Sequence, residues 1–148
     1  MSTNYYLRNQ EEYSNHKTIM EERNRMIEQI MKQLQEWNTA EDDLYDIKFR
    51  IENVANVGYE EFHIGKRSRG WKPLFEKQKG MFTSVKELKE FYVANANKYE
   101  IVDEYGTVLT WDELKKELID WNGERENGDR SDNYTDSEGY TWARYQFS

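Results

Sequence analysis

The sequence predicts an α+β fold, in which a small, mainly antiparallel sheet carries a long N-terminal amphipathic helix and two short capped helices. Three observations lead to this prediction. Apolar residues recur at helical spacing over residues 13–38, two capping boxes precede short helical stretches, and short alternating or aromatic runs lie between them. The length of 148 residues fits one domain, residues 1–148, with one core.

The composition limits the classes of function. Charged residues make up 34% of the chain and the net charge is −8, which argues against general nucleic-acid binding, since such binding relies on neutralising phosphates. The mean hydropathy of −1.12 leans toward disorder, but 11 Tyr, 5 Trp and 6 Phe supply the bulky groups that disordered chains lack. The chain has no cysteine, which excludes disulfides and thiolate metal sites.

The N-terminus lacks the apolar run of a signal peptide or a membrane span. We therefore expect a soluble protein in the cytoplasm of its cell, without membrane association.

Residues 13–38 are expected to form one long helix, because their apolar residues are spaced by three, four and seven positions. The stripe contains Met20, Ile27, Ile30, Leu34 and Trp37. We expect this stripe to pack on the sheet of the same domain. A homodimer through this helix, or its insertion into a groove of a partner, remains open, since fewer than four clean heptads are visible.

Residues 45–52 alternate between apolar and charged side chains, which predicts a strand. A helix is the alternative interpretation of the same region. Its apolar residues at helical spacing are Leu44, Ile47, Ile51 and Val54.

After Gly58, residues 59–64 are predicted to form a strand, residues 65–70 a turn, and residues 71–75 a returning strand. Pro73 interrupts the second strand of this hairpin. Because proline cannot donate to a ladder, we expect Pro73 on an edge strand.

Two capping boxes predict the short helices. Ser84 and Glu87 start a helix expected over residues 85–96, and Thr110 and Glu113 start one that runs to about Trp121. Between them, residues 99–103 are predicted to form a strand and residues 105–107 a turn. Residues 122–139 are rich in Gly, Asn, Asp and Ser and predict a long mobile loop, and the aromatic residues 140–147 predict a terminal strand.

A basic segment stands out in this acidic chain, because residues 62–98 carry nine cations and three carboxylates. Its glycine-punctuated part supplies the candidate binding residues, which are His63, Lys66, Arg67, Arg69, Trp71 and Lys72. The pattern is not a Walker A loop, since Gly70 is followed by Trp71 and Lys72. A solvated hairpin turn, contact with an anion, and recognition of a nucleotide-like ligand stacked on Trp71 are all compatible with it.

The two histidines, His16 and His63, are separated by 47 positions and do not suggest a metal pair. The acidic clusters lack the spacing of a known cation loop, so we expect no metal site and no cofactor. We assign no catalytic residue. A hydrolase that uses His63 with acidic partners is kept as a further alternative.

Several short motifs occur in order along the chain: residues 3–6 (Thr-Asn-Tyr-Tyr), residues 63–66 (His-Ile-Gly-Lys) with Gly70 and Trp71, residues 101–106 (Ile-Val-Asp-Glu-Tyr-Gly) and the aromatic end at 145–148. Together they resemble a family of small proteins of bacteriophages and prophages. Some members of that family carry a cysteine pair that this chain lacks, so no metal role is carried over. The resemblance implies a modulator of a host system. We therefore expect a non-enzymatic phage accessory protein that binds and inhibits a host protein, as an anti-phage defence or counter-defence component.

Overall fold

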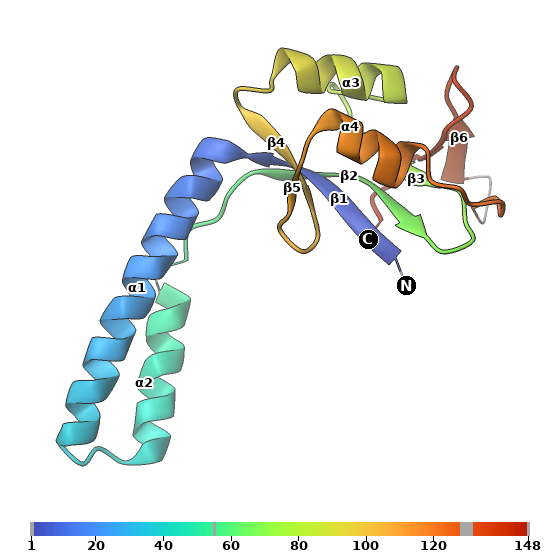
Figure 1. Cartoon of the computed structure of the whole chain (residues 1–148). Helices are drawn as coiled ribbons and strands as arrows, with labels where there is room; N and C mark the ends of the chain where they lie inside the picture. The colour runs from blue at the N-terminus through green and yellow to red at the C-terminus, as the bar shows by residue number, and fades with distance from the viewer. Residues whose placement is uncertain (1, 55, 128–131, 148) are drawn as a thin grey trace. The chain divides into compact units, whose positions relative to one another are not determined.

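The computed structural model describes residues 2–54, 56–127 and 132–147. It confirms the predicted α+β class (Figure 1). The chain divides into two compact units. Residues 11–60 form the hairpin unit, and residues 1–10 together with 61–148 form the sheet unit.

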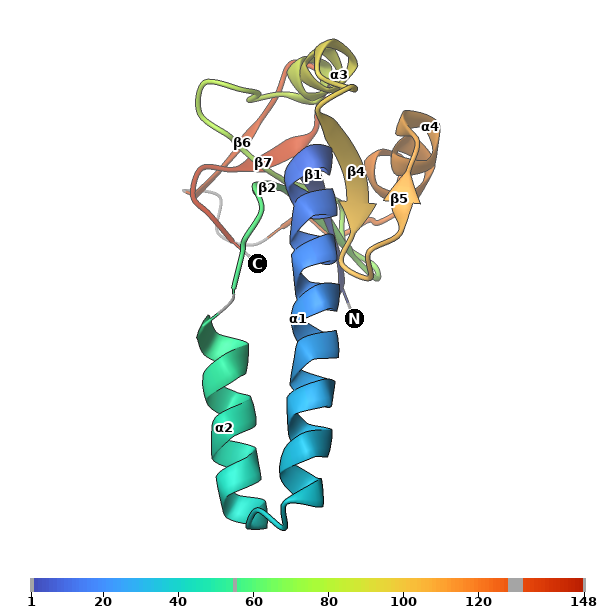
Figure 2. The same cartoon turned by 90° about the vertical axis from the view of Figure 1, so that its left-hand side faces the viewer.

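The hairpin unit consists of two antiparallel helices that lie side by side (Figures 1 and 2). They are α1, Gln10–Glu36, and α2, Glu41–Val54. The long N-terminal helix is thus confirmed.

Of the predicted stripe on α1, Ile27 is buried and Leu34 half-buried, whereas Ile30 and Trp37 are exposed. None of the stripe residues, all of which the structure describes, belongs to the core cluster of the sheet, so the expected packing on the sheet is wrong. The Arg23 side chain donates a hydrogen bond to the Glu52 carbonyl of α2 at 2.8 Å.

The predicted strand over residues 45–52 is wrong, because these residues belong to α2. In a strand the four apolar residues 45, 47, 49 and 51 would share one face, whereas a helix places Tyr45 and Phe49 on the side opposite to Ile47 and Ile51. Ile47 and Ile51 lie on the half-buried side of α2, while Tyr45 and Phe49 are exposed. The helical spacing was therefore the informative pattern.

Seven strands form one sheet in the described part of the sheet unit. They are β1 (Ser2–Asn9), β2 (Glu61–Ser68), β3 (Leu74–Glu76), β4 (Tyr99–Asp103), β5 (Val108–Leu109), β6 (Asn133–Thr135) and β7 (Thr141–Ala143). Their order is β5-β4-β1-β2-β3-β7-β6, and all neighbours are antiparallel except β3 and β7.

The interior strand β1 was not among the predicted strands. It pairs with β2 on one side and with β4 on the other, and Tyr5 and Leu7 are buried in the core. The strand β4 has the bounds that the sequence predicts. Strand β1 forms because it pairs with strands that lie far away in the sequence, β2 and β4, and no local sequence pattern predicted it.

The predicted turn at residues 65–70 is wrong in its position. Strand β2 continues to Ser68, because residues up to Ser68 pair with β1, and the turn falls at Arg69 and Gly70, where Gly70 has a φ of 84°. The expected edge position of Pro73 is also wrong, since β3 lies between β2 and β7. Pro73 directly precedes β3, so its missing N–H removes no bond of the ladder.

Both predicted helix starts are confirmed. Ser84 Oγ accepts a hydrogen bond from the Glu87 N–H at 3.1 Å and starts α3, Val85–Ala94. The Glu87 carboxylate turns to the Thr83 N–H rather than to Ser84. Thr110 and Glu113 form a complete capping box at the start of α4, Trp111–Leu114, which continues as the π-helical segment η1, Lys115–Ile119.

Helices α3 and α4 with η1 pack over one face of the sheet (Figures 1 and 2). Leu88, Leu114 and Leu118 from these helices join Phe75 and Trp142 from the sheet in one core. The sheet residues that alternate with the core positions therefore face the opposite side.

The segment predicted as a long loop, residues 122–139, contains β6 and is therefore not without structure. The amides of Glu124 and Arg125 donate to the Gly70 carbonyl. Residues 128–131 lie outside the described residues, and the mobility of the loop stays a prediction. The predicted terminal strand over residues 140–147 is confirmed only for β7, where Trp142 is fully buried; residues 144–147 are not strand.

The described helices include none that is both long enough and apolar enough to cross a membrane.

Candidate functional site

His63 lies on β2 and is buried, with both ring nitrogens engaged. Its Nδ1 lies 3.1 Å from Glu76 Oε1, and its Nε2 lies 2.9 Å from Asn4 Oδ1. The ring of Phe147 meets the imidazole edge-on, with 4.8 Å between ring centres. The imidazole is therefore enclosed by groups from β1, β3 and the C-terminal segment.

Glu76 is the polar centre of this arrangement and is only 3% exposed. Besides His63, its carboxylate accepts hydrogen bonds from Gln78 Nε2 and from the Phe147 N–H, both at 2.9 Å. A buried carboxylate needs such donors, because the desolvation of its charge is costly. We call the side chains of Asn4, His63, Glu76 and Gln78 the polar cluster.

The polar cluster bears on the alternative of a hydrolase. An imidazole beside a carboxylate is an arrangement that general-base catalysis uses. Here the second imidazole nitrogen is bonded to Asn4, and Phe147 packs on the ring. In this conformation the geometry favours a structural role for His63, which joins three segments of the sheet unit.

The next two cations of β2 point to different sides of the sheet, as neighbouring strand residues do. Lys66 Nζ lies 5.1 Å from the centre of the Phe147 ring. The guanidinium of Arg67 lies 4.5 Å from the Trp121 ring centre and donates to the Glu117 carbonyl at 3.0 Å. Arg67 thus supports the end of η1 rather than extending toward solvent.

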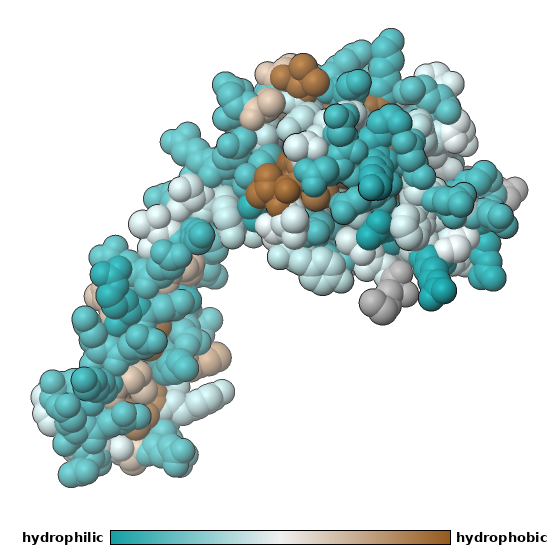
Figure 3. Space-filling model, viewed as in Figure 1, coloured by the Kyte–Doolittle hydropathy of each residue, from teal (hydrophilic) through white to brown (hydrophobic). Residues whose placement is uncertain are grey.

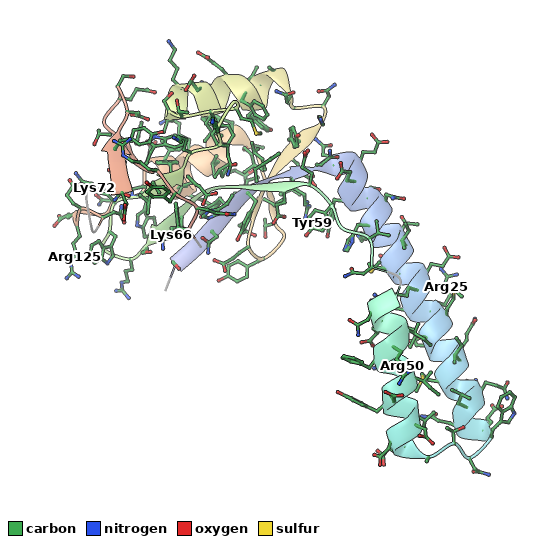
Figure 4. All side chains as sticks on the ribbon, turned by 180° about the vertical axis from the view of Figure 1, so that it is seen from behind. Arg25, Arg50, Tyr59, Lys66, Lys72 and Arg125 are labelled. Atoms are coloured by element: carbon green, nitrogen blue, oxygen red, sulfur yellow. The ribbon has the colours of Figure 1, made fainter. Side chains whose placement is uncertain are left out.

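Trp71 and Lys72 follow the turn and contact the segment after η1. Lys72 Nζ forms an ion pair with Glu126 at 2.5 Å, and the Arg125 guanidinium lies 5.6 Å from the Trp71 ring centre. Figure 4 shows Lys72 and Arg125 in the same region of the sheet unit. Gly123 allows this close approach, because a Cβ atom there would lie 1.7 Å from the Trp71 carbonyl oxygen. Trp71 is therefore part of a packed contact.

The structure does not gather the six candidate residues into one anion-facing surface. His63 and Lys66 lie near Phe147, Arg67 lies under Trp121, and Lys72 pairs with Glu126. Arg69 is exposed in the turn. Sequence reasoning located these residues, but their partners are distant in the sequence and carried no local signal.

A different surface emerges on the hairpin unit, where both helices expose large apolar side chains between polar ones (Figure 3). The exposed fractions are 55% for Met26, 38% for Ile30, 68% for Trp37, 74% for Tyr45 and 57% for Phe49. We call these five side chains together the hairpin patch. They do not share one face, because Tyr45 and Phe49 lie on the side of α2 opposite to Ile51, which lines the groove between the helices. The sequence predicted Ile30 and Trp37 in a packed stripe and Tyr45 and Phe49 in a strand.

Part of the hairpin patch borders a groove of about 310 Å³ between α1 and α2. Its apolar lining comes from Ile19, Met26 and Ile30 of α1 and from Ile51 of α2. Glu22 and Arg23 add polar groups to it. Apolar grooves of this size with a few polar groups are typical of binding surfaces.

Among the described residues, no group of three or more His, Asp or Glu side chains could hold a metal ion.

Comparison with known proteins gives no further assignment, since no family model, no curated protein and no solved structure matches this chain.

Proposed function

We propose that this chain is a non-enzymatic phage accessory protein that binds and inhibits a host protein, and that the hairpin patch makes the contact. The observation that carries the proposal is the exposure of five large apolar side chains on a two-helix unit. Burying one such side chain contributes about 1.5–3 kcal/mol. Exposed apolar patches of this kind mark interaction surfaces in soluble proteins.

The hairpin unit has little core of its own to occupy these side chains. Ile27 is the buried apolar side chain of α1, and the apolar residues of α2 whose burial is described are half-buried or exposed. A partner that packs on Tyr45 and Phe49 would therefore bury apolar surface that the unit leaves exposed. In one mode of recognition, α2 lies in an apolar groove of the partner. In the other, a helix of the partner lies in the groove between α1 and α2.

The charge of the hairpin unit indicates the chemistry of the partner. Residues 11–60 carry twelve carboxylates and six cations, a net charge of −6. The first turn of α2 is acidic throughout, with Glu41, Asp42 and Asp43. Complementary potentials steer association, so the expected partner has an apolar surface with a basic rim.

Tyr45 and Phe49 are the best positions for a test. They are four residues apart on one face of α2, and both are exposed, so their removal costs the folded hairpin little. Aromatic side chains of this kind often dominate the binding energy of an interface. Tyr105, which is 73% exposed in the sheet unit, offers a matched control.

The experiment compares the wild type, Tyr45→Ala/Phe49→Ala and Tyr105→Ala as baits in a host lysate, after circular dichroism has shown equal helix content. A captured host protein is then purified, and its binding and its own activity are measured with each variant. We expect the double variant to lose binding and inhibition while the control keeps both. Equal binding by all three baits, or binding without inhibition, would contradict the proposal.

The same variants address the homodimer that the sequence leaves open. Sedimentation velocity over a range of concentrations reports self-association. A dimer that Tyr45→Ala/Phe49→Ala dissociates would assign the face to a second copy of the chain and would contradict a host partner there.

A further inference from the structure

The sheet unit contains a cleft of about 260 Å³ between α3 and α4 with η1, away from the six residues that the sequence singled out. Its floor is apolar and aromatic. Val85 and Ile119 are buried, and Trp111 and Tyr140 are half-buried beside them. Trp111 is also stacked on Tyr92, at 6.0 Å between ring centres and 22° between planes, which orients the indole.

Three lysines surround this floor. Lys86 and Lys89 come from α3 and Lys115 from η1. Lys115 Nζ binds Asp120 Oδ2 at 2.6 Å, and these contacts with Asp120 raise the pKa of the lysine. In the part of the chain that the structure describes, the side chains of Lys86 and Lys89 have no hydrogen bond or ion pair. Two ammonium groups therefore remain available beside an aromatic floor.

Two carboxylates, Glu90 and Glu138, complete the lining. They make the cleft unsuitable for a ligand that is anionic all round. They suit a ligand with an anionic end and hydrogen-bond donors elsewhere, because a carboxylate accepts from hydroxyl and amino groups. The cleft thus combines a flat apolar floor, two available cations and two acceptors.

We propose that this cleft binds a mononucleotide. The base lies on the floor beside Trp111, the phosphate contacts Lys86 and Lys89, and the carboxylates accept from sugar hydroxyls or base amino groups. Base stacking on an aromatic side chain and charge-assisted contacts to phosphate are the usual sources of such affinity. The volume of about 260 Å³ lies just below the usual range of ligand sites, about 300–1,000 Å³, which suits one nucleotide rather than a dinucleotide.

This inference does not depend on the proposed protein contact, because the cleft lies in the sheet unit and the hairpin patch in the other unit. It also differs from a site at the six candidate residues of the sequence, because none of them lines the cleft.

The probes are AMP, GMP, CMP and UMP, each titrated to millimolar concentration into the ¹⁵N-labelled protein. Adenosine and inorganic phosphate, which each carry half of the proposed contacts, are titrated separately. We expect at least one mononucleotide to shift the amide signals of residues 85–90 and 111–119, and to bind more tightly than either half. No shift with any of the four, or equal shifts with phosphate alone, would overturn the proposal.

Charge reversal supplies the second measurement. Lys89→Glu places a carboxylate in the cleft, and Lys116→Glu makes the same change at a neighbouring exposed position of η1 that does not line it. Losing a charged hydrogen bond to phosphate predicts affinity that is roughly tenfold weaker for Lys89→Glu. Lys86→Glu serves as a second variant should Lys89→Glu fold poorly. An equal loss for Lys116→Glu would show attraction to overall charge and would overturn the site.

Discussion

Asp136 Oδ2 accepts a hydrogen bond from the backbone N–H of Val85 at 3.0 Å, although the two residues are 51 positions apart. The same oxygen accepts from Trp142 Nε1 at 2.8 Å, and Oδ1 accepts from the N–H groups of Glu138 and Tyr140. One carboxylate thus holds the turn between β6 and β7 against the positive end of the α3 dipole.

We expect Asp136→Asn to lower the free energy of unfolding at neutral pH by about 1–3 kcal/mol, because an amide removes the charge and one acceptor. Burial pushes the pKa of Asp136 up, but the hydrogen bonds from Val85, Tyr140, Trp142 and Glu138 outweigh it, so the pKa lies below its usual value. The carboxylate therefore stabilises the fold above the unfolded pKa of about 3.9, and this contribution is lost as the pH falls through the lower folded value.

Urea denaturation between pH 2 and pH 7 checks this prediction. The difference between wild type and Asp136→Asn should shrink toward acid pH. A constant difference over the whole range would mean that the charge of Asp136 contributes nothing.

The raised pKa of the Tyr5 phenol leads us to expect a loss of stability at alkaline pH. Burial raises the pKa of Tyr5 to about 12, an effect that Arg67 opposes and that Glu117, Asp103 and Glu104 reinforce. The folded state keeps the phenol proton more tightly than the unfolded state, so this stability is complete below pH about 10 and declines as the pH rises toward 12. We expect Tyr5→Phe to lack this decline.

Denaturation curves at pH 8 and at pH 11 measure the effect. The free energy of unfolding of Tyr5→Phe, relative to that of the wild type, should be higher at pH 11 than at pH 8. Tyr105→Phe, at an exposed position, is the control and should follow the wild type. The prediction fails if Tyr5→Phe and Tyr105→Phe change alike.

Gly65 lies on β2 opposite Tyr5, where the register of β1 and β2 shifts. A Cβ atom at Gly65 would lie 2.9 Å from the Leu74 carbonyl oxygen and 3.3 Å from Leu118 Cδ2. We therefore expect Gly65→Ala to destabilise the protein by about 1–3 kcal/mol, as overpacking does. Gly58→Ala is the control, since nothing lies within 4 Å of a Cβ atom there. Urea denaturation of both variants decides, and equal stabilities would refute the steric argument.

Ile27 and Trp37 allow a test of which side of α1 is packed. Ile27 is 4% exposed and Trp37 is 68% exposed. We expect Ile27→Ala to cost about 2–5 kcal/mol, whereas Trp37→Ala should leave thermal unfolding of the helices, followed by circular dichroism, almost unchanged. A large loss for Trp37→Ala would show that its indole is buried in solution and does not belong to an available surface.

Glu76→Ala probes the polar cluster, since it leaves His63 Nδ1 and the Phe147 N–H without their acceptor. Unsatisfied buried donors predict a loss of about 1–3 kcal/mol. They also predict faster amide hydrogen exchange at Phe147, because the C-terminal segment loses its attachment. Unchanged exchange at Phe147 would show that other contacts hold this segment.

The sequence by itself determined the elements whose signals are local. Ser84 and Thr110 cap their helices through hydrogen bonds to residues three positions ahead, so a short window contained the whole interaction. The heptad-like spacing of α1 and the bounds of β4 were predictable for the same reason. The basic segment and His63 could also be recognised from the sequence as chemically notable.

The tertiary structure decided the rest, because it depends on partners far along the chain. Residues 45–52 fit a strand and a helix equally, and their helical side packs as part of α2. Strand β1 exists through its pairing with β2 and β4, and that pairing also extends β2 past Gly65 and moves the turn to Arg69 and Gly70. Glu76 and Asn4 reach His63, and α3 reaches Trp111, only in the folded chain. Such contacts depend on the free energy of packing the whole sheet and core. A short window of sequence does not contain the distant residues that contribute to it.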